Sequence, residues 1–189
     1  MGAEAAGCEA RFDSGRVCLD LVAVVPERAG TLGRWLAEAG LLPPGTPLDA
    51  VTAHWVQPFL ELGACVASLV HAHIEGRADD IALARLNAFA AGAAPPAVRA
   101  VRAADGGLVR APLARPECAG LLAAVARDAV ELLTDPVARS GLRRCEGDGC
   151  RRVYVDTSRG RRRRWCSSEM CGNRERVARH RRRAALART

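Results

Sequence analysis

Four of the eight cysteines lie in two closely spaced pairs toward the C-terminal end of the sequence. Each pair has the pattern C-x4-C, and 15 residues separate the two pairs. Two loops of this kind can present four thiolates from two sides, which is the donor set that tetrahedral zinc takes in structural sites. We therefore predict a structural zinc ion, Zn²⁺, with the ligands Cys145, Cys150, Cys166 and Cys171.

Other uses of these cysteines are disfavoured but stay open. Two disulfides would suit an oxidising compartment, whereas the chain is expected to be cytoplasmic. A redox sensor that releases zinc is a further alternative. Four thiolate ligands leave no open position for water or substrate, so catalytic zinc is not expected. The scattered cysteines are expected to be small core residues, namely Cys8, Cys18, Cys65 and Cys118.

Positive charge is concentrated around the predicted zinc site. Residues 143–189 contain 16 Arg and 5 acidic residues, a charge of +11, whereas the rest of the chain has a charge of −4. All 28 basic residues are Arg, which suggests a coding bias, so their clustering is more informative than their identity. A local basic patch indicates a polyanionic partner.

Part of this charge is needed by the metal itself, because zinc with four thiolates is formally a dianion. We assign Arg144, Arg151 and Arg152 to that role. The remaining basic residues are predicted to bind nucleic acid, and a solvated, frayed tail is the alternative. Asn173 could contact an adenine edge, although N-capping of the last helix is the expected role. The predicted nucleic-acid-binding residues are Arg161, Arg162, Arg163, Arg164, Asn173, Arg174, Arg176, Arg179, Arg182 and Arg183.

The N-terminal part is predicted to be mainly helical with one hairpin. Apolar residues at helical spacing, together with Gly, Pro and Asp at segment ends, set the boundaries. The expected elements are a buried strand or helix at 16–25, helices at 31–40, 51–69, 79–91 and 116–133, and a hairpin within 97–113.

Particular residues are expected to start, end or bend these helices. Thr31 is the predicted N-cap of the second segment and Gly40 its end. Asp49 is the predicted N-cap of the long segment, in which Pro58 should cause a kink or a break.

The C-terminal part is predicted to be a small module stabilised by metal. Domains below roughly 40 residues usually need a metal or disulfides to fold. A strand at 153–155 should turn back into a return strand at 161–165, and a helix should follow over 172–187. The predicted fold class is mainly α (α+β): a helical domain at 1–135, a linker at 136–144, and a zinc-stabilised hairpin-plus-helix module at 145–189.

The segment 145–183 resembles the CGNR zinc finger, because it contains the sequence Cys171-Gly172-Asn173-Arg174. The turn at 155–159 is also similar to the Asp-x-Ser turn of that family. Segments 17–25 and 32–42 resemble the start of the ABATE domain, which often precedes this finger and is described as a stress-induced transcription regulator. Where that family often has Asn-Thr, this chain has Ala23 and Val24.

The resemblance implies a bacterial transcription regulator whose zinc finger binds DNA. It implies a sensor or dimerisation role for the N-terminal domain, with a small-molecule effector or a homodimer as partner. Asp20, Arg34 and Trp35 lie in the resembling stretches and are candidate ligand-binding residues, although burial would explain Trp35 equally well. An RNA-binding zinc module, or a zinc-stabilised protein that binds an acidic protein, stays open as an alternative.

Other classes of protein are disfavoured by the sequence. No segment resembles a signal peptide or reaches the ~20 apolar residues needed to cross a membrane, so a cytoplasmic protein without membrane contact is expected. His71 and His73 are two residues apart on a predicted helix and face different sides. No catalytic motif is recognised, so no enzymatic activity and no catalytic residue are predicted.

Overall fold

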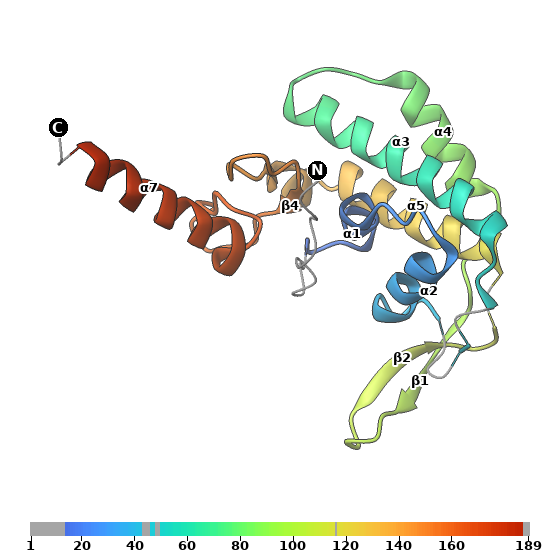
Figure 1. Cartoon of the computed structure of the whole chain (residues 1–189). Helices are drawn as coiled ribbons and strands as arrows, with labels where there is room; N and C mark the ends of the chain where they lie inside the picture. The colour runs from blue at the N-terminus through green and yellow to red at the C-terminus, as the bar shows by residue number, and fades with distance from the viewer. Residues whose placement is uncertain (1–13, 43–45, 48–49, 116, 187–189) are drawn as a thin grey trace.

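The computed structural model describes residues 14–42, 46–47, 50–115 and 117–186. Among these residues helices dominate, and two short antiparallel hairpins accompany them, so the mainly α (α+β) prediction is confirmed (Figure 1). None of the helices in this part of the chain is both long and apolar enough to cross a membrane. The elements are α1 (Val17–Val24), α2 (Ala29–Glu38), the 3-10 turn η2 (Ala53–Trp55), α3 (Val56–Ile74), α4 (Asp80–Ala91), β1 (Val98–Arg102), β2 (Leu108–Pro112), α5 (Cys118–Thr134), α6 (Pro136–Ser140), β3 (Leu142–Arg144), β4 (Val153–Val155), the π-helical turn η3 (Ser168–Gly172) and α7 (Asn173–Leu186).

Helices α3 and α5 form the centre of the core, and α1 and α4 pack against them. Leu62 and Val66 are four residues apart on α3 and therefore share a buried face. On α5, Val125 and Ala129 have the same spacing and are fully buried. Because aromatic residues are only 4% of the chain, small and branched aliphatic side chains fill most of this core.

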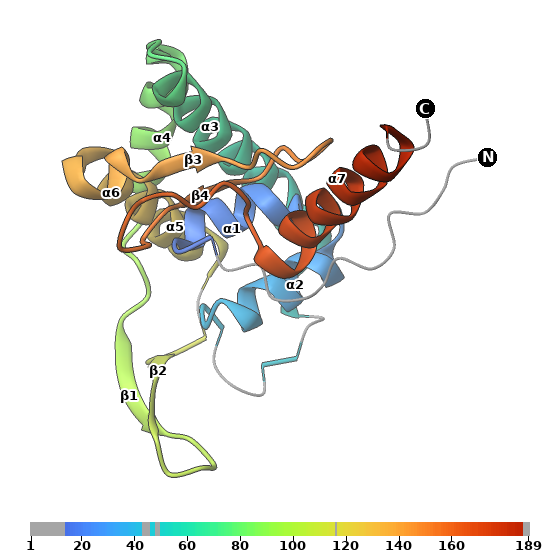
Figure 2. The same ribbon diagram turned by 90° about the vertical axis from the view of Figure 1, so that its left-hand side faces the viewer.

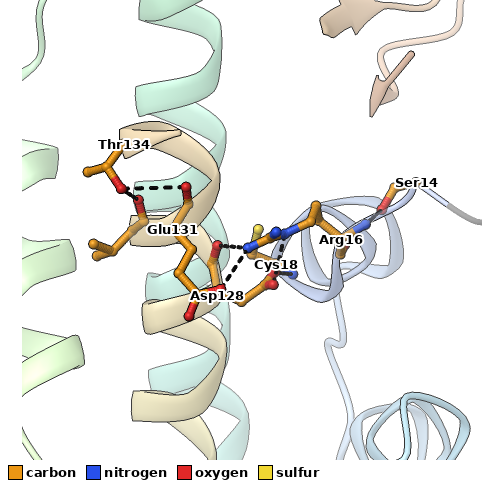
Figure 3. Close-up of polar contacts among 7 residues, drawn as sticks. Ser14, Arg16, Cys18, Asp128, Glu131 and Thr134 are labelled. Carbon is orange, nitrogen blue, oxygen red and sulfur yellow. Dashed lines mark hydrogen bonds and ion pairs between the residues drawn. The ribbon is translucent and has the colours of Figure 1, made fainter. Parts of the chain in front are cut away.

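Asp128 of α5 stabilises the start of α1 (Figure 3). Its Oδ2 accepts the backbone N–H of Cys18 at 2.9 Å, and its Oδ1 lies 2.9 Å from Arg16 Nε. Arg16 Nη2 also donates to the carbonyl oxygen of Asp128 at 2.8 Å. The N-cap residue of α1 provides no side-chain cap, so Asp128 satisfies an otherwise unpaired first-turn N–H and complements the positive helix end.

Hairpin β1–β2 extends away from the helices (Figure 2). The two strands pair antiparallel with Val101 opposite Val109. Asp105 accepts the N–H of Gly107 at 2.9 Å, and Gly106 has a positive φ of 84° that favours glycine. The predicted hairpin is thus confirmed, although Leu108 remains 69% exposed at its outer end.

Strands β3 and β4 join the C-terminal module to the helical domain. Leu142 and Val155 pair across the hairpin, and both are buried in the main core with Val153. The Val155 N–H also donates to the carbonyl oxygen of Ser14 at 3.0 Å, just before α1. Arg144 Nη2 lies 2.9 Å from Glu75 Oε1 at the end of α3. The segment predicted as a linker, 136–144, therefore contains α6 and β3 and packs against the core.

Several predicted helix ends are confirmed. The segment 16–25, left open between strand and helix, contains α1. Asp79 caps α4 by accepting the Ala82 N–H at 2.9 Å. Gly40 follows α2 with φ 67°, and the Leu41 N–H donates to the Leu36 carbonyl at 2.9 Å, as in a glycine-ended helix.

Other local predictions are wrong. Thr31 lies inside α2, because the helix already begins at Ala29. Pro58 neither kinks nor breaks α3; it lies in the first turn, where a proline costs no helical hydrogen bond. The predicted cap Asp49 lies outside the described residues.

The predicted return strand at 161–165 is also wrong, since β4 pairs with β3. The Asp156 carboxylate accepts the backbone N–H of Arg163 at 2.9 Å, which holds this segment in an irregular turn. The Glu146 N–H then donates to the Arg164 carbonyl at 2.9 Å, so the segment lies beside the first cysteine loop.

We expect Asp128→Ala to lower the free energy of unfolding by about 2 kcal/mol, because hydrogen bonds to a charged group are worth roughly 1.5–3 kcal/mol each. Glu131→Ala is the matched control: its side chain is 74% exposed and meets the same Arg16, so a loss below about 0.5 kcal/mol is expected. Urea unfolding of the full chain measures both. Equal losses in the two variants would contradict this role of Asp128.

Candidate metal centre and basic surface

Two loops bring the four paired cysteines together. Cys145 follows β3 and Cys150 precedes β4, so the β3–β4 hairpin positions both. Cys166 precedes η3 and Cys171 lies within it. The four Sγ atoms all lie within 4.8 Å of one another, and three of these cysteines are buried. The geometry thus brings together the complete ligand set predicted from the spacing.

The distances fit a tetrahedral metal ion. Zinc–sulfur bonds of ~2.3 Å place sulfur atoms about 3.8 Å apart around a tetrahedron. Cys150 Sγ lies 3.8 Å from Cys166 Sγ, which in turn lies 3.6 Å from Cys171 Sγ. Zinc bound here would hold both loops together and supply folding energy to the module.

Backbone N–H groups support one of the sulfur atoms. Cys145 Sγ accepts the N–H of Cys166 at 3.3 Å and that of Gly147 at 3.4 Å. A Cβ on Gly147 would lie 3.0 Å from Cys171 Cβ and 3.2 Å from its Sγ, so a side chain at this loop position would require the ligand Cys171 to shift. Such contacts fix the ligand orientation and strengthen thiolate binding.

The thiols show why a cation is needed. Burial raises the pKa of Cys171 to about 11, and burial together with the neighbouring sulfur atoms raises the pKa of Cys166. Burial also opposes ionisation of Cys145, but the two N–H donors hold its pKa below the ordinary value. Four thiolates at this separation repel one another, so a divalent ion is required to keep them ionised together.

A small core surrounds the cysteines. Tyr154 is fully buried, its hydroxyl donates to the Arg163 carbonyl at 2.6 Å, and burial raises its pKa to about 12. Trp165 packs against Gly172, and a Cβ there would lie 3.4 Å from the ring. Trp165 is therefore part of this core.

Asp156 fixes the turn after β4. It is 2% exposed and accepts the N–H groups of Ser158 and Arg163, each at 2.9 Å. Burial opposes its charge, but these hydrogen bonds hold its pKa below the ordinary value.

The arginine run 161–164 divides into structural and free side chains. Arg163 lies with its guanidinium carbon 4.4 Å from the Tyr154 ring centre and donates to the carbonyls of Trp165 and Cys166. Arg161 has φ 46° and donates to Ser140 Oγ on α6. Arg164 pairs with Glu146 at 2.6 Å. Arg162 is exposed and has no polar side-chain partner among the described residues.

Helix α7 extends away from the rest of the described chain (Figure 1). Arg176 donates to the Ser168 carbonyl at 3.4 Å, and Arg182 lies 3.9 Å from Glu175. Within the described chain, no side-chain hydrogen bond or ion pair is found for Arg174, Arg179, Arg181 and Arg183. Val177, an apolar residue of this helix, is 42% exposed.

Asn173 is exposed and has helical dihedral angles, φ −70° and ψ −43°. It is therefore not an N-cap, and that expectation is wrong. The Ser167 hydroxyl accepts the Met170 N–H at 3.3 Å and caps η3 one turn earlier.

The three candidate residues of the N-terminal domain have different surroundings. Asp20 accepts the Ser14 N–H at 3.1 Å. Trp35 is 5% exposed and packs edge-on against Phe59, with ring centres 6.1 Å apart. Arg34 is exposed on α2. The packing thus supplies a structural role for Trp35, and a ligand role for the three stays a prediction.

The residues that support the ligands from outside cannot be identified from the sequence pattern. The tight contact of Gly147 with Cys171 depends on the folded site, and no local sequence pattern indicates it. Arg144 was assigned to the thiolate charge but pairs with Glu75. Tyr154, the only tyrosine of the chain, was predicted as a strand residue without its core role.

Comparison with protein families gives two matches. Residues 142–184 match the model described as CGNR zinc finger. Residues 15–136 match the ABATE model, described as "Putative stress-induced transcription regulator". No curated protein matches the chain. The two domains stated from sequence resemblance are thus confirmed, and the four cysteines lie within the zinc-finger match.

We expect the purified chain to contain about one zinc ion and Cys166→Ser to lose most of it, because three thiolates leave the site open. Cys118→Ser is the matched control, since Cys118 lies on α5 outside the site. Elemental analysis together with thermal unfolding measures both effects. Unchanged zinc content in Cys166→Ser would contradict the assignment.

Gly147→Ala should weaken zinc binding by roughly tenfold or more, as losses of supporting contacts do. The reason is the 3.0 Å approach of the new Cβ to Cys171. Gly30→Ala is the control, because a Cβ there meets nothing within 4 Å. Competition with a chelator of known affinity gives both constants, and equal constants would refute the steric argument.

Proposed function

We propose, since the chain belongs to the ABATE family, that it is a bacterial, cytoplasmic transcription regulator that binds DNA through its zinc finger. The metal in this proposal is structural zinc, and the chain has no catalytic step. The observation that supports the proposal best is the set of unpaired arginines on α7, directly after the four-cysteine site.

Bound zinc would fix the first residues of α7 relative to the β3–β4 hairpin. Cys171 lies in η3, which continues directly into α7, while Cys145 and Cys150 lie on loops joined to β3 and β4. One ion would therefore connect the base of the arginine helix to the hairpin that packs in the main core. Without such a connection, an isolated helix of this length is marginal in water.

The dimensions of α7 suit a DNA groove. Its 14 residues span about 21 Å, and the major groove admits a helix of this diameter. Arg176, Arg179 and Arg183 lie on one side of the helix. Exposed guanidinium groups form charge-assisted, often bidentate bonds with phosphate oxygens.

The proposed contact surface is narrower than the set predicted from the sequence. It consists of exposed side chains whose donors are not fully used within the protein. Arg161 and Arg163 stabilise the module instead, and Arg164 pairs with Glu146 at 2.6 Å. The proposed surface is Arg162, Arg174, Arg176, Arg179, Arg182 and Arg183, with Asn173 beside it.

The N-terminal domain completes the proposal. Its contact with β3 and β4 would allow a small-molecule effector or a second copy bound there to change the position of the finger. A role in stress responses follows from the family description alone.

With six arginines on phosphate, affinity for duplex DNA should fall about a thousandfold or more between 50 and 200 mM salt. Changing Arg176, Arg179 and Arg183 together to Gln should remove about three phosphate contacts and reduce the slope of log K against log salt by roughly 2.7. Fluorescence anisotropy with zinc-loaded protein measures both.

The matched control changes Arg28, Arg85 and Arg99 to Gln, which removes the same charge from exposed sites on the N-terminal domain. Its DNA affinity should stay within a few-fold of the wild type. Equal losses in the two triple variants, or no binding at low salt, would contradict the proposal. Tighter binding to structured RNA in direct competition would favour the RNA alternative.

A further inference from the structure

A pocket of about 260 Å³ lies where the helical domain meets the zinc module. Three elements form it: the end of α3, α6 and β3. None of the four cysteines and no residue of α7 lines it. Its lining residues are His73, Ile74, Arg139, Ser140, Leu142, Arg143 and Arg144.

Three of the lining side chains are guanidinium groups. Arg139 Nη1 donates to the Leu133 carbonyl at 2.9 Å, which fixes it at the end of α5. Arg143 Nη1 donates to the carbonyls of Ser140 and Leu142 at 3.0 and 2.8 Å. Each guanidinium has five N–H donors, so both arginines keep donors for a ligand while their own positions are fixed.

The positive charge is only partly balanced locally, by Asp156 near Arg143 and by Glu75 at Arg144. Arg144 pairs with Glu75, and Glu75 is also bound by Arg77. Arg161 adds a further positive charge through its bond to Ser140. Neither Arg139 nor Arg143 forms an ion pair with any described carboxylate. A pocket lined in this way attracts an anion.

The volume of the pocket and its other lining residues indicate which class of anion could bind. Drug-sized ligands occupy pockets of about 300–1,000 Å³, so this pocket suits a smaller molecule. Ile74 and Leu142 contribute apolar surface, while Ser140 and His73 add polar groups. The arginine fork matches the tetrahedral oxygens of a phosphoryl group.

We propose that this pocket binds the phosphoryl group of a small phosphorylated molecule at the joint between the two domains. The ligand would contact α3 on one side and β3 on the other, and β3 leads directly to the zinc ligand Cys145. This site does not depend on whether α7 binds DNA.

Calorimetric titration of the full, zinc-loaded chain with ribose 5-phosphate tests the site. Saturable binding is expected, with backbone amide NMR shifts in residues 139–144. Arg143→Gln should weaken binding of the probe at least tenfold. Arg143→Lys keeps the charge but loses the forked pair of donors, so its affinity should lie between those of the wild type and Arg143→Gln. Ribose without phosphate should not bind.

Arg99→Gln on the exposed hairpin is the matched charge control and should bind within twofold of the wild type. No saturation by roughly 10 mM probe, or equal binding by wild type and Arg143→Gln at unchanged thermal stability, would overturn the proposal. If Arg143→Gln also weakens DNA binding, the pocket accepts a phosphate of the DNA backbone. If the DNA affinity of this variant is unchanged, the ligand of the pocket is a free small anion.

Discussion

Mutual repulsion of four thiolates within 4.8 Å is the constraint on which the C-terminal part of the structure depends. The sulfur atoms converge from a strand hairpin and from a helical turn, and a cation at their centre would keep all four ionised and hold both elements together. The buried Tyr154 and the glycine loop at Gly147 then complete a core too small to be stable by apolar burial alone.

The β3–β4 hairpin belongs to two cores, the main helical core and the small core around the cysteines, and it therefore joins the two parts of the structure. On one side, the ends of β3 and β4 lead to the metal ligands; on the other, Leu142, Val153 and Val155 pack among the residues of α1, α3 and α5. The Arg144–Glu75 pair lies at the same joint. The proposed phosphate pocket and the zinc site are thus joined by a few residues of β3.

The sequence predicted those features that depend on residue type and short spacing. The C-x4-C pairs identified the ligands, Asp79 identified a helix start, and Asp105-Gly106-Gly107 identified the hairpin, because each acts through local geometry. Features that depend on contacts between residues far apart in the sequence were not predicted. Whether residues 153–155 pair with 142–144 or with 161–165 is decided by the Asp156 carboxylate and by burial of Leu142, and neither is visible as a local pattern. The separation of Arg161 and Arg163 from Arg162 likewise depends on contacts with α6 and Tyr154.

The backbone hydrogen bond from Val155 to Ser14 joins residues 141 positions apart in the sequence. During synthesis the helices of the N-terminal domain leave the ribosome first, and β4 can complete their core only after residue 155 has emerged. Until then the surface that receives Leu142 and Val155 is exposed apolar area, which favours aggregation. A truncation before β3 would leave the same surface uncovered permanently, so dissection of this protein at the domain boundary would not produce two native halves.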